Sequence, residues 1–504
     1  MPDPRSPVVV GVGQTAQRVP ADQARSPIEL LVDAARRADA DAGATRSLVD
    51  ALDVVAVVQI ASWPYADPGR FVARELGTEP RRTVVSTVGG NSPLLLVHEM
   101  AADIAAGRAD VVLVGGAEAM HTRWRARREP RVHLTWPTGD DAPCLHVVGD
   151  DRPGSNEYEN AHHAFVPVTV YPLLETALRA RARRDVAEHQ RAIGALWSTF
   201  AAVAEQNPAA WSRTAYSPDE IATPSTDNRV VCFPYLKRMC ANIDVDQGAA
   251  LLLCAYETAV AAGVPADRMV FLHAGADGHD HYWFSERDSL AAAPGIGVVV
   301  RDALGANGLG VDDVARFDLY SCFPSAVQLA LDALGMSGPT GGDTRPLTTT
   351  GGLAFAGGPV NNYSTHGVAT MVDALRADPG SVGVTTALGW YATKHSASVW
   401  STRPPATGFQ RVDPAATQAR IDALPRREVA GLVVESVRIE ATSVMVERDG
   451  TPQVAIVAAH TADGRRVLAT TRDADMMGAM VREPWEGRTV EVDNDGTTNT
   501  VRSP

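Results

Sequence analysis

Cysteine is scarce in this sequence. The 504 residues include only five cysteines, and no two of them form a Cys-x-x-Cys pair. A disulfide framework and a thiolate zinc site both require more closely paired cysteines. The segment His279-Asp280-His281 contains metal-ligating residue types, but such a group in an aromatic loop is more typical of a polar turn. We therefore expect no disulfide framework and no metal.

Long apolar runs and an excess of basic residues are also absent. No run approaches the roughly 18 apolar residues that a membrane span requires, and residues 1–14 lack the basic and apolar segments of a secretory signal. The 46 basic and 60 acidic residues leave a net charge of −14, which disfavours general nucleic-acid or acidic-membrane binding. We expect a cytoplasmic protein with no nucleic-acid partner. Any anionic ligand must then bind in a local basic pocket.

Lysine is almost missing. Only Lys237 and Lys394 are lysines among the 46 basic residues, and all the others are arginines. A chain that uses arginine nearly everywhere can retain lysine where a compact ammonium group is needed. Two surface lysines left by chance are the alternative interpretation.

What is present is a regular alternation of elements over residues 1–400. Short β-branched runs such as 8–10 and 53–60 predict buried strands, and residues 27–40, 98–106 and 173–207 predict helices. Such alternation is typical of a layered α/β fold. The spacing from Asp53 to Gly89 is similar to that from Asp318 to Gly357, and each glycine turn leads into a helix. We interpret this as an internal duplication.

Composition divides the chain into four regions. The two similar halves are residues 1–120 and 236–405, and between them residues 121–235 form an inserted loop region rich in Arg, His, Pro and aromatics. Residues 402–408 have the composition of a linker. Period-two alternation and Asp-Gly turns follow it, so residues 409–504 predict a small antiparallel β domain.

Several segments resemble the thiolase superfamily. Thr87–Met120 is similar to the thiolase nucleophile region, and Asp318–Ser325 (DLYSCFPS) is similar to the H-D-C-F form of its N-E-A-F segment in sterol-carrier-type thiolases. Three further segments also resemble thiolase segments, and they are residues 242–250, 351–367 and 385–389. The resemblance covers about residues 1–405 and implies a duplicated five-layer thiolase-like fold. It also implies a CoA thioester as ligand, with no cofactor beyond that CoA.

The residues that a thiolase uses for catalysis are absent. The resemblance places Gly90 at the nucleophilic cysteine, Tyr320 at the asparagine, Gly358 at the histidine and Ala387 at the second cysteine. A thiolase needs an activated thiolate to hold the acyl group. Cys322 lies next to the N-E-A-F position, where a substitute nucleophile is less expected than a buried packing residue. Ordinary thiolysis is therefore not expected.

Other groups remain at these positions. The turn before the predicted helix suggests an oxyanion hole made of backbone N–H groups. We expect Gly90 and Asn91 of this turn, together with Gly389 from the other half, to supply those groups. We expect Ser92, Cys322 and Gly358 to line the substrate site. A tyrosine beside a cationic group can have a lowered pKa and act as a base, which gives as catalytic candidates Tyr320, Tyr363, His366, Lys394 and His395. The tyrosines can instead be hydroxyls that cap a site without catalysis.

A base and an oxyanion hole without a nucleophile suit aldol-type cleavage or formation of a C–C bond in a CoA thioester. Thiolase-like aldolases of steroid breakdown are similar in having tyrosines here and a partner domain of OB type, and the C-terminal domain resembles a fused, OB-like counterpart. A catalytically inactive acyl-CoA or lipid carrier, and a scaffold subunit, are the alternatives.

Two further expectations concern binding and assembly. Arg123, Arg125 and Arg128 follow the predicted strand that contains Gly115 and Gly116, at the start of the region that binds CoA in thiolases, and are candidates to bind the CoA phosphates, with a solvated loop as the alternative. Thiolases pair through the sheet edge before the nucleophile turn, so the resemblance implies a homodimer. Residues 81–86 begin with two arginines at that edge, which weakens the pairing and leaves a monomer possible.

Overall fold

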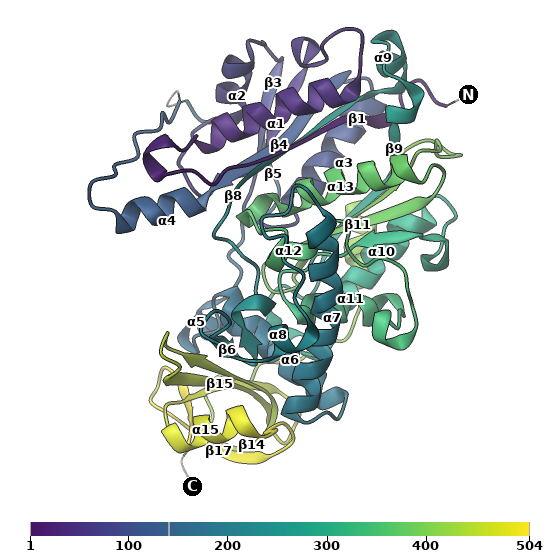
Figure 1. The fold of residues 1–504 in the computed structure, drawn as a ribbon. Coiled ribbons are helices and arrows are strands. Elements are labelled where there is room, and N and C mark those ends of the chain that lie inside the picture. Colours follow the sequence, from purple (N-terminus) through teal and green to yellow (C-terminus); the bar gives the residue numbers. More distant parts are fainter. Residues whose placement is uncertain (1, 140–141, 503–504) are drawn as a thin grey trace.

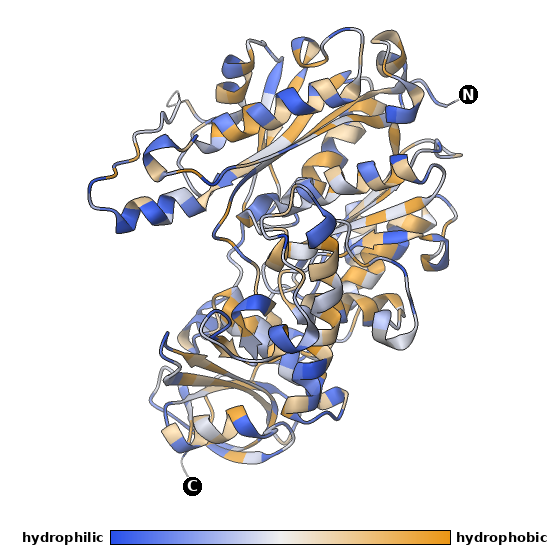
Figure 2. Cartoon of the chain, in the orientation of Figure 1, coloured by the Kyte–Doolittle hydropathy of each residue, from blue (hydrophilic) through white to orange (hydrophobic). Residues whose placement is uncertain are grey.

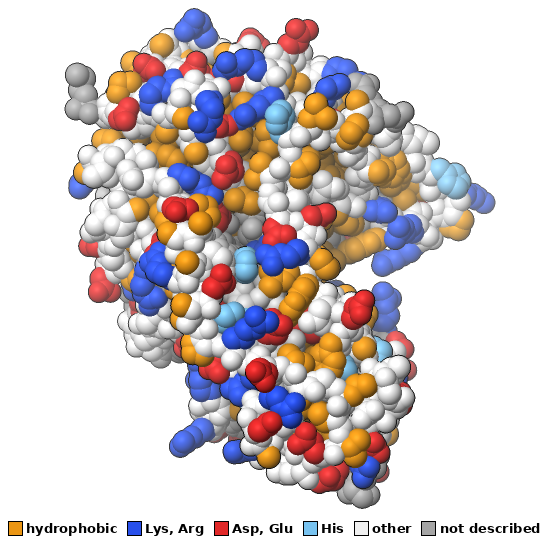
Figure 3. Space-filling view, turned by 180° about the vertical axis from the view of Figure 1, so that it is seen from behind, with side chains coloured by type: hydrophobic (Ala, Val, Ile, Leu, Met, Phe, Trp, Pro, Cys, Tyr) orange, Lys and Arg blue, Asp and Glu red, His pale blue; other side chains and the backbone are white. Residues whose placement is uncertain are grey.

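The structure is a computed structural model that describes residues 2–139 and 142–502. A layered α/β core lies at the N-terminal end of an elongated molecule, a helical region lies in the middle, and a β barrel forms a separate lobe at the C-terminal end (Figures 1 and 3). Apolar residues gather on the strands and on the helix faces that cover them (Figure 2).

One large mixed sheet runs through the core in the order β10-β11-β12-β9-β1-β8-β4-β2-β3-β5, and β13 pairs with β9. β2, β3 and β4 are parallel to one another, and so are β10 and β11. The antiparallel strands β1 and β9 connect the two halves. The strand bounds are β1 Pro7–Ala16, β2 Val54–Val57, β3 Arg82–Ser86, β4 Val111–Ala119, β5 Val147–Val148, β8 Asp246–Ala255, β9 Val270–His279, β10 Arg316–Asp318, β11 Val382–Gly389, β12 Lys394–Ser401 and β13 Gln410–Arg411.

Helices cover this sheet in both halves. The first half contributes α1 Pro27–Ala42, α2 Pro68–Leu76 and α3 Ser92–Ala105, and the second contributes α9 Tyr256–Ala261, α10 Pro294–Gly305, α11 Pro324–Leu334, α12 Gly352–Phe355 and α13 Tyr363–Ala377. Local sequence sets their ends: Ser26 and Glu29 form a capping box at α1, and Gly43 ends that helix with φ 60°. α3 and α13 pack together in the middle of the core and share one apolar cluster. The predicted duplicated α/β fold is confirmed.

The inserted region is mostly helical. Its elements are α4 Met120–Arg128, α5 Glu157–Ala161, α6 Pro167–Arg181, α7 Val186–Gln206, α8 Pro218–Ala222, β6 Val230–Phe233 and β7 Tyr235–Leu236. The single helix predicted over residues 173–207 is wrong. Arg183 has φ 53°, which ends α6, and the Asp185 side chain then caps α7 by accepting from the Glu188 N–H at 2.7 Å.

Short 3₁₀ turns connect these elements at Ala21–Gln23, Val49–Ala51, Lys237–Met239, Ala266–Arg268, Phe284–Glu286, Val311–Asp313, Pro339–Gly341 and Val360–Asn362.

The C-terminal strands close into a five-stranded barrel. β14 pairs with β17 on one side and with β15 on the other, which closes the order β14-β15-β16-β18-β17. All of these pairings are antiparallel except β16 with β18. The bounds are α14 Pro414–Asp422, β14 Glu435–Val446, β15 Pro452–His460, β16 Arg466–Thr471, α15 Ala474–Arg482, β17 Thr489–Asn494 and β18 Asn499–Val501. The predicted β domain is thus confirmed as a barrel, although β13 and α14 pack on the core beside β9.

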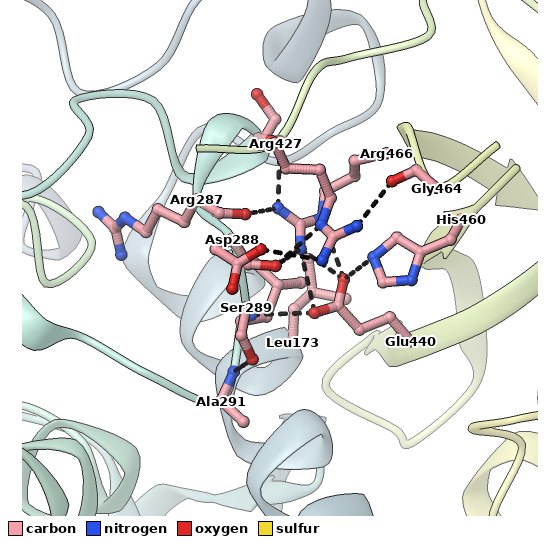
Figure 4. Close-up of polar contacts among 12 residues, drawn as sticks. Leu173, Arg287, Asp288, Ser289, Ala291, Arg427, Glu440, His460, Gly464 and Arg466 are labelled. Atoms are coloured by element: carbon pink, nitrogen blue, oxygen red, sulfur yellow. Dashed lines mark hydrogen bonds and ion pairs between the residues drawn. The ribbon is translucent and has the colours of Figure 1, made fainter. Parts of the chain in front are cut away.

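The barrel is fixed to the rest of the chain by backbone pairing and by buried charges. β6 of the inserted region extends the barrel sheet by pairing with β14. At the opposite face, Arg466 is completely buried and contacts the Glu440 carboxylate at 2.7 Å (Figure 4). Arg466 also donates to the carbonyl oxygens of Ser285, at 3.2 Å, and of Arg287 in the core. A charged pair inside the barrel is therefore hydrogen-bonded to the core when the barrel lies against it.

No helix among residues 2–139 and 142–502 combines the length and the hydropathy needed to cross a membrane.

The Glu440–Arg466 pair predicts a pH-dependent stability. Burial by itself would raise the pKa of Glu440, but the hydrogen bond from His460 and the charge of Arg466 outweigh it and hold this pKa at about 2, below its ordinary 4.5. A lowered folded-state pKa stabilises the protein above pH about 4.5, and this contribution, about 3 kcal/mol, is lost as the pH falls toward about 2. Glu440→Gln should therefore lower the free energy of unfolding at pH 7, and the difference from wild type should shrink in acid. Denaturant titrations at pH 7, 4 and 3 measure this, with the exposed Glu447→Gln as the control; an equal effect of both variants would contradict it.

Candidate functional site

The turn Gly89–Ser92 lies between β3 and α3, at the carboxyl end of the strand. Gly89 has φ 153°, a conformation that side chains rarely adopt, and its N–H donates to Asn361 Oδ1 at 3.0 Å. The Ser92 hydroxyl donates to the Thr87 carbonyl oxygen at 2.8 Å. The N–H groups of Gly90 and Asn91 make no hydrogen bond with any residue that the structure describes. Two backbone donors are thus free at the start of a helix.

The space beside Gly90 is occupied by the other half of the core. A β-carbon on Gly90 would lie 2.2 Å from the Tyr320 hydroxyl oxygen and 2.4 Å from the Leu388 carbonyl oxygen. Both distances are much shorter than any ordinary nonbonded contact. Gly90 is therefore required here by the close approach of Tyr320 and the end of β11.

Tyr320 and Tyr363 lie together behind the turn. Their rings meet edge to face, with centroids 5.5 Å apart. The Tyr363 hydroxyl contacts Thr350 Oγ1 at 2.6 Å and donates to Asp318 Oδ1 at 3.2 Å. Burial raises the pKa of both phenols, because their anions would lose hydration. The predicted lowering of a tyrosine pKa is wrong, and both side chains are neutral phenols at pH 7.

Asp318 is the acidic group of this cluster, and the sequence reasoning did not select it. Its side chain is buried and accepts hydrogen bonds from a run of three threonines, Thr348, Thr349 and Thr350. Burial raises the pKa of this carboxyl group in spite of those donors. The signal was available, because Asp318 begins the DLYSCFPS segment and the three threonines are consecutive in the sequence.

Lys394 and His395 point in opposite directions from β12, as neighbouring strand residues do. Lys394 Nζ donates to the carbonyl oxygens of Val88, at 3.4 Å, and of Asp150, so it supports the turn before Gly89. Burial lowers the pKa of this ammonium group. His395 instead contacts the buried Asp280 carboxylate at 2.9 Å on the other side of the strand. The structure therefore brings Lys394, and not His395, to the turn.

Two more polar residues are buried here: His366, which lies on α13, and Asn91, which lies in the turn. His366 Nδ1 contacts Gln14 Oε1 at 2.7 Å, and burial lowers the pKa of the ring to about 4. His366 is therefore neutral and hydrogen-bonded to β1. Asn91 lies against Gly89 and Gly389, since a β-carbon on either glycine would come within 2.6 Å of its Oδ1 atom. Gly389 thus faces the turn from the second half.

Cys322 and Gly358 flank the same region. Burial raises the pKa of the Cys322 thiol to about 12, so this thiol is protonated and poorly nucleophilic at neutral pH. The Gly358 N–H donates to the Asn242 carbonyl oxygen at 2.9 Å. A β-carbon on Gly358 would lie 3.4 Å from its nearest neighbour, the Asn242 carbonyl oxygen, so this position has room for a side chain.

The three arginines predicted to bind phosphate diverge around α4. Arg123 donates to the Ala61 carbonyl oxygen at 3.0 Å, on the side that faces the loop after β2. Arg125 donates to the Val19 carbonyl oxygen at 3.2 Å and pairs with Glu129. Arg128 is exposed. The structure does not bring these three side chains to one point.

The turn itself is covered by protein. Tyr320, Asn91, Cys322 and Lys394 are all buried, whereas Val88, just before the turn, is 39% exposed. The residues that the structure describes include no group of three or more His, Cys, Asp or Glu side chains placed to hold a metal ion. The cluster therefore offers neutral hydroxyl donors, free backbone N–H groups and one buried carboxyl group.

Comparison with solved structures identifies the fold. A monomeric SCP2-thiolase-like protein type 1 from Mycobacterium smegmatis is 34% identical, with a TM-score of 0.84 and complete coverage of both chains. The chain belongs to the SCP2-thiolase-like protein type 1 family. Residues 417–497 also match the family model described as the additional C-terminal domain of thiolase-like protein type 1. A search of curated proteins finds no match.

More distant structures share the core of this thiolase-like protein. The Ltp2-ChsH2(DUF35) aldolase is 18% identical with a TM-score of 0.60, over 79% of this chain and 98% of its own. The dimeric peroxisomal thiolase of Saccharomyces cerevisiae is 14% identical with a TM-score of 0.55, over 80% of this chain and 98% of its own. At these identities the likeness shows the fold alone. The predicted membership of the thiolase superfamily is confirmed.

The packing at Gly90 predicts that a cysteine cannot be restored there. In this thiolase-like protein, Gly90→Cys should destabilise the fold by about 1–3 kcal/mol, because the new side chain overlaps Tyr320 and the Leu388 backbone. The variant should show no thiolysis of acetoacetyl-CoA.

The matched control is Gly358→Cys, where the same side chain has room. Thermal denaturation of both variants and a thiolysis assay with free CoA measure the effect. A Gly90→Cys protein as stable as wild type, or one with thiolase activity, would contradict this account of the site.

Proposed function

We propose that this thiolase-like protein binds a CoA thioester at the Gly89–Ser92 turn and acts on it without a cysteine acyl-enzyme. The observation that carries this proposal is the Tyr320 hydroxyl, which takes the space of a nucleophilic side chain beside Gly90. The free N–H groups of Gly90 and Asn91 support binding of the thioester oxygen, because two converging donors stabilise an enolate.

The reaction class that suits these groups is aldol cleavage or formation. In cleavage of a 3-hydroxyacyl-CoA, the hydroxyl proton is removed, the Cα–Cβ bond breaks, and a carbonyl compound leaves. The thioester enolate then takes a proton at Cα, so that a shortened acyl-CoA is released. The aldolase among the similar structures supports this choice, since its core shares this fold.

The pKa directions suggest separate roles for the two tyrosines. Tyr320 remains a neutral phenol beside Gly90, so it is placed to give a proton to the enolate. Tyr363 donates to Asp318, whose raised pKa makes the carboxylate a stronger base than usual. We assign proton removal to this pair. Lys394 positions the turn through the Val88 carbonyl oxygen.

A non-catalytic carrier of CoA thioesters is the second candidate function. The burial of Tyr320, Asn91 and Cys322 favours it, because a reacting substrate must displace these side chains to reach Gly90.

A panel of CoA thioesters distinguishes these functions. Purified protein should cleave a branched or steroid 3-hydroxyacyl-CoA and leave acetoacetyl-CoA with free CoA unchanged, as followed by mass spectrometry of the products. Tyr320→Phe should lower turnover about 100-fold, since it removes the proton donor and keeps the ring. Tyr256→Phe, on the surface helix α9, is the control. Thioester binding without any turnover would favour the carrier, and thiolysis would contradict both functions.

We also propose that the protein is a monomer that acts in the cytoplasm. The outer edge of β3 is already paired with β5 at Val85 and Ser86, and the related M. smegmatis protein is described as monomeric. Arg81 and Arg82 form ion pairs with Asp53 and Asp103 of the same chain. All five cysteines are free and buried, which suits a reducing compartment.

Light scattering after size exclusion should therefore give a mass near 53.4 kDa at micromolar concentration. Val147→Asp, which adds a charge to the exposed edge strand β5, should leave that mass unchanged, because a charged edge strand opposes pairing. A wild-type mass of twice this value would contradict the proposal.

A further inference from the structure

The turn that joins β11 to β12 is held in an uncommon backbone conformation. It consists of residues 390–393 and directly follows Gly389, which faces the Gly89–Ser92 turn. Trp390 has φ 57° and Ala392 has φ 55°, and both values lie in the left-handed region that residues other than glycine seldom adopt. Such a conformation persists only where the surrounding structure imposes it. The contacts that impose it therefore also fix where β11 ends.

Tyr171 of α6 contacts both left-handed residues through its hydroxyl. This hydroxyl donates to the Trp390 carbonyl oxygen at 3.0 Å and accepts from the Ala392 N–H at 3.0 Å. The Tyr171 side chain is completely buried, and its ring stacks on Phe323 with centroids 4.6 Å apart. Burial raises the pKa of this phenol well above its usual value, so the hydroxyl keeps the proton that it donates. One fixed hydroxyl thus satisfies both a donor and an acceptor of the same turn.

A second anchor reaches the turn from the segment before α10. The Arg287 guanidinium donates to the Tyr391 carbonyl oxygen at 2.7 Å and to Thr393 Oγ1 at 2.8 Å. In Figure 4 this guanidinium points away from the barrel strands, whereas the Arg287 carbonyl oxygen faces Arg466 of the barrel. Tyr171 and Arg287 therefore bind the four residues of the turn alternately.

The barrel also fixes the helix that carries Tyr171. Thr176 of α6 donates to the Thr442 carbonyl oxygen of β14 at 2.9 Å and accepts from the Thr442 N–H at 3.0 Å. Ser443 of the same strand donates to the Thr169 carbonyl oxygen at 3.3 Å. Tyr171 lies between Thr169 and Thr176 in the sequence, so the part of α6 that carries it is bonded to β14 on both sides. The barrel is therefore connected to this turn of the core through α6.

The end of β11 forms one side of the candidate site. A β-carbon on Gly389 would lie 2.6 Å from Asn91 Oδ1, and the Leu388 carbonyl oxygen would lie 2.4 Å from a β-carbon on Gly90. A shift of this strand end would change its distance from the two free N–H groups beside it. Donors that stabilise an enolate must already be in place when the charge develops. A displaced donor therefore weakens the transition state more than the binding of the substrate.

We propose that Tyr171 is a positioning residue for the proposed reaction. Its hydroxyl keeps Trp390 and Ala392 in the left-handed conformation, which fixes Gly389 against the turn that contains Asn91. This inference rests on the proposed function and extends it, because it gives the C-terminal barrel a part in the reaction. Tyr171 lies outside the segments that resemble thiolases, so the sequence analysis did not select it.

The test compares two buried tyrosines that stack on the same phenylalanine ring. Tyr171→Phe removes the hydroxyl that holds the turn, whereas Tyr235→Phe removes a buried hydroxyl that is bonded to Glu175 and Ser325 instead. With the 3-hydroxyacyl-CoA that wild type cleaves, Tyr171→Phe should lower kcat about tenfold and change KM by less than about twofold, because only the transition state uses the displaced donors. Tyr235→Phe should leave both constants unchanged.

Hydrogen exchange reports on the turn without any turnover. The Ala392 N–H should exchange about tenfold faster in Tyr171→Phe than in wild type, because it loses its acceptor. Its exchange should be unchanged in Tyr235→Phe. Mass spectrometry of peptides that contain residues 390–393 gives these rates for the full-length protein.

The outcomes separate the two proposals. An unchanged kcat in Tyr171→Phe, the same loss in both variants, or a loss that appears in KM alone would overturn the positioning role and leave the proposed function standing. If wild type cleaves no 3-hydroxyacyl-CoA, the proposed function fails. Faster exchange at Ala392 in Tyr171→Phe alone then supports Tyr171 as the anchor of the turn, and equal exchange in both variants overturns it.

Discussion

The two halves of the core meet at Gly90, and the closeness of that contact governs the chemistry of the whole region. Tyr320 and the Leu388 carbonyl oxygen come from the second half and leave no space for a β-carbon. The first half therefore has to supply a backbone turn instead of a nucleophile. Such a turn provides backbone hydrogen-bond donors. The N–H groups of Gly90 and Asn91 make no hydrogen bond with any described residue.

Burial determines the protonation of the groups around this contact. The two tyrosines are kept neutral, Asp318 becomes more basic, and the Lys394 ammonium group becomes more acidic. All four shifts have the same cause, since each charged form loses hydration inside the core. The cluster is therefore suited to passing protons between neutral groups, and it is poorly suited to holding an acyl group on a thiolate.

The C-terminal barrel is part of the same folded body. Arg466 pairs with Glu440 inside the barrel and also donates to carbonyl oxygens of the core, so separating the two would remove the hydrogen bonds that join the barrel to the core at this buried cation. β6 extends the barrel sheet from the inserted region. The additional domain thus holds the inserted helices in place, and Tyr171 of α6 stacks on Phe323, next to Cys322 of the core.

The sequence by itself determined the duplicated α/β core, the C-terminal β domain and the glycine at position 90. These depend on periodicity, on turn residues and on the identity of single residues such as Gly90, all of which are local. It did not determine the break at Arg183, the neutral state of the tyrosines, or the opposite directions of Lys394 and His395. Only the tertiary structure decided that Asp318 joins Tyr363 and that Tyr171 contacts the turn after β11. The physical reason is that burial and contact depend on segments distant in the sequence, which meet only when the sheet and its helices pack together.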